Sequence, residues 1–586
     1  MYSGIKSVQL LVALLKAHNV KDIIMSPGGS DIAIIHSIET DDFFNCYSVV
    51  DERSAVYFAI GIAQQKQAPV ACVCTSGTAV SNYLPGMTEA FYQNVPVIAI
   101  TADKEPYRLN QLMLQKIDQT GIFNSVTKKS VNLPVVKNGN DFWYCERLIN
   151  EALVELDHHG KGPVHINIPI VESGAVYNCA ELPEVRKIEI ISRDKSIDVW
   201  ASFIPKLASA KKILVIAGQN INFTDDDIKY VEKFAEKYNC VISVEHMSNL
   251  KCKGCISTYR VSEVSAPGIF TDLIPDLVIS FGNNIASYKL KPLIKENKSA
   301  YTHWQIDEAG RIRDFSDRLT NVFECTPQYF FKYFAENAPE GAANNMDYYK
   351  LWATKYNEIE YPDFEFSNFY VAKKLSENIP QDSVLHLAIL NSTRTMQFFD
   401  LAPNVKTYSN IGALGIDGCL STFLGQAVST ENLAFLVVGD LSFFYDMNAA
   451  GIRHVGKNVR IILVNNTGGS EFHFFMGKNK IPTINEHICA EHHKTAEGWI
   501  KSLGYDYFSA SSKEEIDSII PEFAKPSDKP MFLEVFTDME KDAKLTNEFF
   551  HNNRIKFGGI KAKLIDKAKS VIKPEHIEKA KKFLKK

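Results

Sequence analysis

An aspartate and an asparagine, each directly after an apolar stretch, have the residue types and spacing to hold a metal ion. Asp440 follows AFLVVG and Asn466 follows IILVN, 26 positions further on. If these stretches are neighbouring parallel strands joined by a helix over about 443–455, both side chains lie at the carboxyl edge of one sheet. A carboxylate, a side-chain amide and the turn carbonyl of Gly468 are oxygen ligands that suit Mg²⁺, Mn²⁺ or Ca²⁺ better than Zn²⁺.

The helix expected after Asp440 makes the same place attractive to an anion. The free backbone N–H groups around Gly439, Leu441 and Ser442, together with the positive end of the helix dipole, would bind a phosphate. Metal ligands and a helix start therefore predict a clamp for a diphosphate group. The alternative is that Asp440 only caps the helix and Asn466 only starts a turn.

The spacing from Gly439-Asp440 to Asn465-Asn466 resembles the signature of the thiamine diphosphate enzymes, and three further segments follow the order found in that superfamily. They are 51–55 (DERSA), 75–79 (TSGTA) and 162–169 (GPVHINIP). The resemblance implies that Glu52 is the catalytic carboxylate, which contacts the aminopyrimidine ring of the cofactor and shares a proton with a ring nitrogen. We expect Glu52 to be buried among apolar neighbours, because burial favours the protonated carboxyl group. Taken alone, Glu52 would be a solvated helix residue.

Within the superfamily, the chain resembles the 2-succinyl-5-enolpyruvyl-6-hydroxy-3-cyclohexene-1-carboxylate synthases, the carbon–carbon ligating enzymes of menaquinone biosynthesis. The matching segments are 26–28 (SPG), 51–55, 101–103 (TAD), 115–119 (QKIDQ), 391–394 (NSTR), 412–418 (GALGIDG), 439–442 and 465–469. The resemblance implies that Ile416 bends the cofactor and that the carbonyl near Leu414 holds its 4′-amino group. It also places Ser392 at the cofactor.

Several polar positions depart from the synthase pattern. The positions that the resemblance assigns to substrate binding, departures included, are Ser30, Asp31, Lys104, Gln115, Arg394, Ile411 and Glu471. The arginine of the family's Ser-Pro-Gly-Ser-Arg is absent from 26–31 (SPGGSD), and that of its Asn-Arg-Gly is replaced by Ile411. Lys104 replaces a third arginine, so that a point charge stands where a planar guanidinium is expected. Glu471 stands where the family has an apolar residue. Only Gln115 and Arg394 remain of the expected polar set.

These departures predict altered substrates, because the synthases handle molecules with several carboxylates. Each charge-assisted hydrogen bond contributes about 1.5–3 kcal/mol, so two lost arginines remove roughly 3–6 kcal/mol, or about two to four orders of magnitude in affinity. Asp31 and Glu471 would repel anions if they face the pocket. A less carboxylated acceptor, or a small donor such as pyruvate, fits better. The alternative is that Lys104, Arg108 or Arg394 compensates.

Four activities remain open on these residues. The first is decarboxylation of a 2-oxo acid donor, with thiamine diphosphate and a divalent ion, and ligation of the resulting acyl carbanion equivalent to an acceptor. The second is the synthase reaction itself, the third is simple 2-oxo acid decarboxylation, and the fourth is a cofactor-binding protein without turnover. The resemblance further implies a homodimer or homotetramer, in which the pyrimidine-binding unit of one subunit meets the diphosphate-binding unit of another.

The elements that must position these residues are three α/β units, each with a doubly wound parallel sheet. Short apolar runs such as 22–26, 70–75, 213–217, 277–281, 384–387 and 461–464 read as buried strands, with helical segments between them. We place a pyrimidine-binding domain at 1–182, a central domain at 183–350 and a diphosphate-binding domain at 351–540. A basic helical tail, 541–586, carries 14 Lys and Arg against 5 Asp and Glu.

Composition excludes other classes of protein. The 586 residues carry a net charge of −5, so no global field favours nucleic acid, and no apolar run approaches the roughly 18 residues of a membrane span. No signal peptide is recognisable, and the 11 cysteines suit free thiols in a reducing cytoplasm. We expect Cys252 and Cys255 to be unlinked thiols without a metal or redox role. We expect His492 and His493 at the surface or behind the metal ligands.

Overall fold

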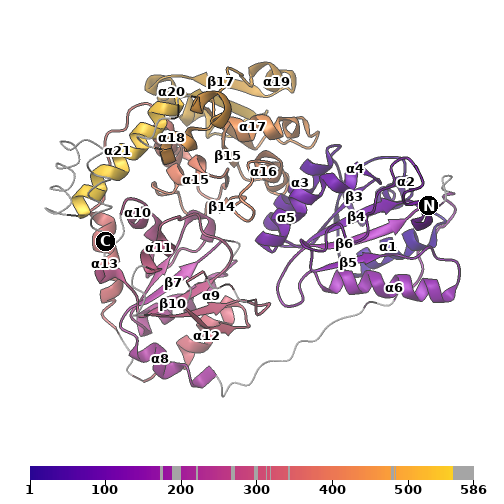
Figure 1. Cartoon of the computed structure of the whole chain (residues 1–586), viewed down its shortest axis with the longest axis horizontal. Coiled ribbons are helices and arrows are strands. Elements are labelled where there is room, and N and C mark those ends of the chain that lie inside the picture. Colours follow the sequence, from indigo (N-terminus) through magenta and orange to yellow (C-terminus); the bar gives the residue numbers. More distant parts are fainter. Residues whose placement is uncertain are drawn as a thin grey trace.

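The computed structural model describes residues 1–171, 176–185, 187, 200–219, 222–265, 271–295, 301–311, 313, 315–316, 318–340, 344–476, 481 and 483–558. Three units of parallel sheet covered by helices follow one another along the chain (Figure 1). Within these residues, all pairing between named strands is parallel. The α/β fold class predicted from the sequence is confirmed.

The first sheet has the strand order β2-β1-β3-β4-β6-β5. Its strands are β1 (Asp22–Ser26), β2 (Asn45–Ser48), β3 (Val70–Cys74), β4 (Val97–Asp103), β5 (Lys129–Asn132) and β6 (Val164–Pro169). The helices around it are α1 (Lys6–Ala17), α2 (Ile32–Glu39), α3 (Glu52–Lys66), α4 (Thr78–Asn82), α5 (Leu84–Gln93), the 3₁₀ turn η1 (Pro106–Arg108) and α6 (Gly139–Val154). The central strands are fully buried, as the apolar runs predict.

The second sheet has the order β12-β11-β10-β7-β8-β9. Its strands are β7 (Ile213–Ala217), β8 (Cys240–Ser243), β9 (Cys255–Ile256), β10 (Leu277–Phe281), β11 (Thr302–Ile306) and β12 (Leu319–Phe323). Its helices are α8 (Ile204–Ser209), α9 (Asp225–Lys237), η2 (His246–Ser248), α10 (Thr258–Glu263), η3 (Thr271–Leu273), α11 (Leu290–Lys295), α12 (Pro327–Glu336) and α13 (Asp347–Asn357).

The third sheet has the order β14-β13-β15-β16-β18-β17, which repeats the strand arrangement of the first. Its strands are β13 (Val384–Leu387), β14 (Lys406–Tyr408), β15 (Ala434–Gly439), β16 (Val459–Asn465), β17 (Asp506–Ala510) and β18 (Met531–Phe536). Its helices are α14 (Asn368–Asn378), α15 (Asn391–Met396), α16 (Cys419–Ala427), α17 (Asp440–Asp446), η4 (Met447–Gly451), α18 (Ser470–Met476), η5 (Ile484–Ile488), α19 (Glu497–Ser502), α20 (Lys513–Phe523) and α21 (Met539–Phe557). The helix expected over 443–455 is thus α17, which begins at Asp440 and ends at Asp446.

The boundary placed at 540/541 falls in the first turn of α21. Phe549 and Phe550 of this helix are buried against the third unit, so the chain up to 558 is packed structure. The rest of the expected basic helical tail, 559–586, lies outside the described residues. In the part of the chain that is described, no helix has the length and apolar character to cross a membrane.

The two cysteines of the C-x₂-C segment contradict the expectation of unlinked thiols, because the structure joins Cys252 to Cys255 in a disulfide. Gly254 between them has φ +94°, and this left-handed turn brings the two Cα atoms to 5.3 Å. The other nine cysteines form no disulfide. Two cysteines at this spacing are too few to bind zinc alone, but they can form a disulfide with each other.

The first and third units touch through α3 and α16, whose backbones approach closely because a glycine lies on each side. A Cβ on Gly61 of α3 would lie 2.0 Å from the carbonyl oxygen of Thr422, and a Cβ on Gly425 of α16 would lie 2.1 Å from that of Phe58. Both neighbours are backbone atoms and cannot rotate away. The two glycines thus set the distance between the units (Figure 1).

Gly425→Ala tests this contact. We expect the substitution to lower the free energy of unfolding by about 3 kcal/mol, since the added methyl group meets backbone rather than a movable side chain. Gly498→Ala is the matched control: this glycine lies within α19 with no atom within 4 Å of the added Cβ, and alanine should stabilise it by about 0.5–1 kcal/mol. Denaturant titration of both variants measures the difference, and equal stabilities would contradict the close contact.

Candidate functional site

The structure brings Asp440 to the turn that follows Asn466, at the carboxyl ends of adjacent strands β15 and β16. One carboxylate oxygen of Asp440 accepts the backbone N–H of Gly468 at 2.9 Å, and the other accepts that of Leu441 at 2.7 Å. Asp440 and Asn466 are both buried. The side chains that the sequence predicted as metal ligands therefore share one buried edge of the third sheet.

Asp542, a residue that the sequence analysis did not single out, orients Asn466. Its Oδ2 accepts the Asn466 Nδ2 at 3.2 Å and the Thr537 hydroxyl at 2.7 Å, while its Oδ1 accepts the backbone N–H of Asn368 at 2.9 Å. Burial raises the pKa of Asp542 to about 6, against the effect of these three donors. Because the amide nitrogen of Asn466 is committed to Asp542, its oxygen is the atom that can face a cation.

These residues fit the divalent ion that the sequence suggests. Carboxylate, amide and backbone oxygens are the ligands of hard cations. A buried polar atom also points at the site: the Nε2 of His492 lies 3.5 Å from Asp440 and has no hydrogen-bond partner. Beside them, a Cβ on Gly439 would meet nothing within 4 Å, which leaves open space at the start of α17. His492 thus lies directly behind Asp440, a predicted metal ligand, which is one of the two places that the sequence favoured for it.

Glu52 is the first residue of α3, where Asp51 caps the helix by accepting the Ser54 N–H at 3.2 Å. Its neighbours attach this helix end to the third unit. Arg53 donates to the carbonyl of Tyr445 at 2.9 Å, and the Ser54 hydroxyl donates to Asp446 at 3.3 Å. Glu52 itself is half-buried rather than enclosed among apolar neighbours, which corrects the sequence-based expectation.

Asp446 links the start of α3, near Glu52, to the third unit. It is fully buried and accepts the backbone N–H and the hydroxyl of Ser421 in α16, as well as the hydroxyl of Ser54. Burial raises the pKa of Asp446 to about 6, and the Ser421 donors oppose that rise. One carboxylate therefore joins α17, α16 and α3, the helices that carry or flank the predicted cofactor ligands.

The loop 412–418 presents two apolar side chains to solvent between the units. Leu414 is 42% exposed with φ +59°, and Ile416 is 37% exposed. The carbonyl of Ile416 accepts the Ser442 hydroxyl at 2.6 Å, and Asp417 accepts the Tyr57 hydroxyl at 2.9 Å. The loop is thus fixed from the third unit and from the first, and Leu414 and Ile416 are left free to contact a ligand.

Asp31 does not face open space. It is fully buried at the start of α2, and its Oδ1 accepts the Gly28 N–H at 2.8 Å while its Oδ2 has no partner. Burial raises the pKa of Asp31 to about 6, and the negative charge of Glu52 adds to this rise. Ser30 beside it contacts the segment 75–79 through the Thr75 and Ser76 hydroxyls, each at 3.2 Å.

Arg394 and Glu471 form a buried ion pair. The guanidinium nitrogens lie 2.5 and 2.6 Å from the two carboxylate oxygens, in a bidentate arrangement, and the ring of Phe474 covers the guanidinium at 4.3 Å. Each charge of the pair therefore has its counterion inside the protein. Glu471 is not a free negative charge, and the Arg394 guanidinium already binds a carboxylate.

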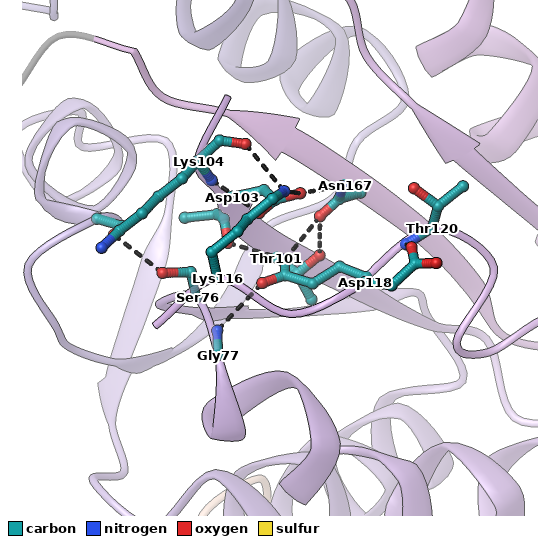
Figure 2. A network of polar contacts seen from close by, with 12 residues as sticks. Ser76, Gly77, Thr101, Asp103, Lys104, Lys116, Asp118, Thr120 and Asn167 are labelled. Carbon is teal, nitrogen blue, oxygen red and sulfur yellow. Dashed lines mark hydrogen bonds and ion pairs between the residues drawn. The ribbon is translucent and has the colours of Figure 1, made fainter. Parts of the chain in front are cut away.

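The remaining predicted substrate positions are Gln115, Lys104 and Ile411, which differ in their exposure to solvent. Gln115 is exposed, and the segment around it is attached to β4: Lys116 pairs with Asp103 at 2.8 Å and the Lys104 amine donates to the carbonyl of Leu114 (Figure 2). Gln119 adds a buried bond to the N–H of Gly77 at 3.1 Å. Ile411 is buried, and its carbonyl accepts the Asn284 amide at 2.8 Å; Ser392 in α15, which the sequence assigned to the cofactor, is also buried.

Comparison with known proteins agrees with this geometry. A family model described as "Thiamine pyrophosphate enzyme, N-terminal TPP binding domain" matches residues 5–122. The fold and this match define a thiamine diphosphate-dependent enzyme. Along nearly its whole length the chain is also similar to curated proteins named 2-succinyl-5-enolpyruvyl-6-hydroxy-3-cyclohexene-1-carboxylate synthase.

Three such relatives define the extent of the similarity. The protein of Phocaeicola vulgatus is 39% identical over 562 residues, that of Bacteroides fragilis 36% over 570, and that of Flavobacterium johnsoniae 31% over 570. Each alignment covers 94% of this chain and 99% of the relative. The chain belongs to the 2-succinyl-5-enolpyruvyl-6-hydroxy-3-cyclohexene-1-carboxylate synthase family.

Asp542→Asn tests the orientation of Asn466. The substituted amide keeps the shape of the side chain but presents a donor or a weaker acceptor to Asn466, so we expect the affinity for thiamine diphosphate with Mg²⁺ to fall about 10–100-fold. Titration of the cofactor by intrinsic fluorescence or calorimetry measures this. The exposed Asp528→Asn is the control and should bind like the unmodified protein. An unchanged affinity in Asp542→Asn would remove Asp542 from the site.

Proposed function

We propose that this chain binds thiamine diphosphate and Mg²⁺ between its first and third units, decarboxylates a 2-oxo acid and ligates the acyl unit to an acceptor. The observation that carries the proposal is the shared edge of β15 and β16, where Asp440, Gly468 and Asn466 lie together. Asp440, Asn466 and the Gly468 carbonyl would hold the ion, and the start of α17 would bind the diphosphate. The cofactor supplies a carbanion-stabilising centre for decarboxylation.

The chain's own residues would orient the cofactor and exchange a proton with it. The resemblance assigns Glu52 to a ring nitrogen and the Leu414 carbonyl to the 4′-amino group. The position of Glu52 at the end of α3 that touches α17, through the bonds of Arg53 and Ser54, supports the first assignment. The exposure of Leu414 and Ile416 between the units supports the second, since both can make apolar contact with a bound ring.

The name of the relatives suggests a donor and an acceptor. A succinyl unit forms when 2-oxoglutarate loses CO₂, and isochorismate carries the ring, enolpyruvyl, hydroxyl and carboxylate groups that the name contains. We take these two compounds as the first candidate substrates. Burial of Asp31 and pairing of Glu471 with Arg394 support this choice, because neither carboxylate is left as a free charge that would repel an anionic substrate.

A second candidate, a donor or acceptor with fewer carboxylates, is favoured by the same ion pair. Arg394 is one of the two polar residues retained from the expected substrate set, and its guanidinium is already engaged by Glu471. Half-buried Lys104 and exposed Arg108 carry positive charge in the segment before Gln115, and the Lys104 amine donates to the carbonyl of Leu114. This arrangement offers little for a substrate with several carboxylates.

Two further parts of the proposal concern the assembly and the domains. We propose that the units 1–182, 183–350 and 351–540 act as pyrimidine-binding, central and diphosphate-binding domains of a cytoplasmic homodimer or homotetramer. Resemblance to the thiamine diphosphate enzymes supports the pairing of a first unit with a third unit, either of which could come from a partner subunit. Nine of the eleven cysteines form no disulfide, which supports a reducing compartment, whereas the Cys252–Cys255 disulfide does not.

Turnover with defined substrates tests the proposal. With thiamine diphosphate and Mg²⁺, we expect CO₂ release from 2-oxoglutarate and, when isochorismate is added, a product that contains both carbon skeletons, measured by mass spectrometry. Free aldehyde as the sole product in the presence of acceptors would instead establish a simple decarboxylase. No CO₂ from any of a broad panel of 2-oxo acids would refute the enzyme proposal.

Glu52→Gln separates binding from chemistry. The glutamine keeps the size of the side chain but cannot ionise, so we expect cofactor binding within about threefold of the unmodified protein and a loss of turnover of about 10²–10⁴-fold. Exposed Glu336→Gln, on the central unit, is the control and should keep full activity. Full turnover by Glu52→Gln would show that another group exchanges the proton.

Glu471→Gln distinguishes the two candidate substrate sets. Loss of the counterion leaves a buried guanidinium, and we expect the free energy of unfolding to fall by about 3 kcal/mol. If Arg394 faces the substrate, the released guanidinium should also lower the KM for a multiply charged acceptor. Denaturant titration and steady-state kinetics measure the two effects, and a KM that does not change would place Arg394 outside the substrate site.

A further inference from the structure

A series of buried, hydrogen-bonded polar side chains, called the glutamine relay below, crosses from the third unit into the first and ends at the loop 412–418. Its members, in order, are His386, Gln426, Gln64, Gln93 and Glu89, and all five are buried. His386 and Gln426 lie on β13 and α16 of the third unit, and the other three lie on α3 and α5 of the first. The glutamine relay therefore passes through the contact between α3 and α16.

The hydrogen bonds of the glutamine relay all have the same sense, with each donor pointing toward Glu89. Gln426 Nε2 donates to Gln64 Oε1 at 2.9 Å, Gln64 Nε2 donates to Gln93 Oε1 at 2.7 Å, and Gln93 Nε2 donates to a carboxylate oxygen of Glu89. At the far end the Gln426 oxygen faces His386 Nδ1 at 3.1 Å. That oxygen is an acceptor, so His386 donates from Nδ1. Successive bonds of this kind polarise one another toward the final acceptor.

Glu89 is that acceptor, and it also binds the loop that precedes Leu414. The Glu89 carboxylate accepts the backbone N–H of Gly412 at 3.1 Å and that of Ala413 at 2.6 Å. Gly412 is packed so closely that a Cβ there would lie 2.7 Å from the Gln93 side chain. Leu414, with its left-handed backbone, follows directly. Glu89 therefore fixes the backbone at Ala413, the residue directly before Leu414, and so limits how the Leu414 carbonyl can be oriented.

We propose that Glu89 is a positioning residue for the cofactor, which acts by fixing the 412–414 backbone from the opposite unit, with the glutamine relay as its support. The inference rests on the proposed function, because it assigns Glu89 to the Leu414 carbonyl that would hold the 4′-amino group. Glu89 does not itself reach the reacting atoms. Its two backbone bonds make the geometry of one unit's cofactor loop depend on the docking of the other unit.

A carboxylate is required at this position because three donors converge on it. Two backbone N–H groups and the Gln93 amide all point at Glu89, and an amide in its place would direct one N–H against another. Burial raises the pKa of Glu89, while the bonds from Gln93, Ala413 and Gly412 favour the charged form. Glu89→Gln therefore removes the acceptor with almost no change in shape.

Hydrogen exchange of the protein without cofactor tests the contact directly. In Glu89→Gln we expect the amides of Gly412 and Ala413 to exchange at least about tenfold faster than in the unmodified protein, measured by mass spectrometry on a peptide covering 408–420. Thr88→Ala is the matched control and should leave this exchange unchanged, because Thr88 is a half-buried residue of the same helix whose hydroxyl donates to the carbonyl of Leu84. Unchanged exchange in a folded Glu89→Gln would overturn the proposal.

Kinetics test the positioning role. In Glu89→Gln we expect kcat to fall about 10–100-fold while the KM for the 2-oxo acid stays within about twofold, because the substrate pocket is intact and only the cofactor is misplaced. A wild-type kcat would refute the positioning role even if the loop exchanges faster. If the unmodified protein has no activity on any donor, the proposed function fails, whereas the exchange result stands independently.

A second variant keeps the test decisive if Glu89→Gln does not fold. Gln64→Met removes the side-chain amide that lies two hydrogen bonds from Glu89 in the relay, and it leaves the Glu89 carboxylate in place. We expect a smaller acceleration of the Gly412 and Ala413 amides, about threefold, with the cooperative support lost. If the exchange in Gln64→Met equals that of the unmodified protein, the glutamine relay does not support Glu89.

Discussion

The close contact of α3 with α16 is the constraint on which the site depends. Gly61 and Gly425 let the two helix backbones meet, and any larger residue would separate the units. The same contact places the first turn of α3, with Glu52, beside α17, whose first residue is Asp440. The predicted proton-transfer group and the predicted metal ligand come from opposite ends of the sequence, so their relative position is decided by this one packing distance.

Buried carboxylates, each met by several donors, support that contact and the predicted metal site. Asp446 joins the helices through Ser54 and Ser421, Glu89 holds the loop at Gly412 and Ala413, and Asp542 orients Asn466. A buried carboxylate without such partners would cost several kcal/mol. Because every donor must be in place, Asp446 and Glu89 favour one arrangement of the first and third units, while Asp542 fixes Asn466 within the third unit. The polar interior therefore makes the site geometry specific, while the apolar packing provides most of the stability.

The sequence predicted the elements whose signal is local. Short apolar runs identified central strands such as β1, β7 and β13, and Asp51 and Asp440 marked the starts of α3 and α17. A short edge strand such as β14 carries no such pattern and was missed. Asp542 was assigned to a basic tail because its role exists only where α21 meets the turn after β16. Glu89 and Gln93 are four residues apart on one helix, but nothing in that spacing indicates a partner more than three hundred residues away. The disulfide at Cys252 and the ion pair of Arg394 likewise depend on folded geometry.

The central claim is that Asp440, Asn466 and the Gly468 carbonyl bind one divalent ion opposite Glu52. A crystal structure of the protein with thiamine diphosphate and Mn²⁺, with anomalous scattering to locate the metal, tests it most directly. The account predicts a single Mn²⁺ at about 2.2 Å from an oxygen of each of these three residues, with the cofactor ring against Glu52. A manganese ion bound elsewhere, or a cofactor ring remote from α3, would contradict it.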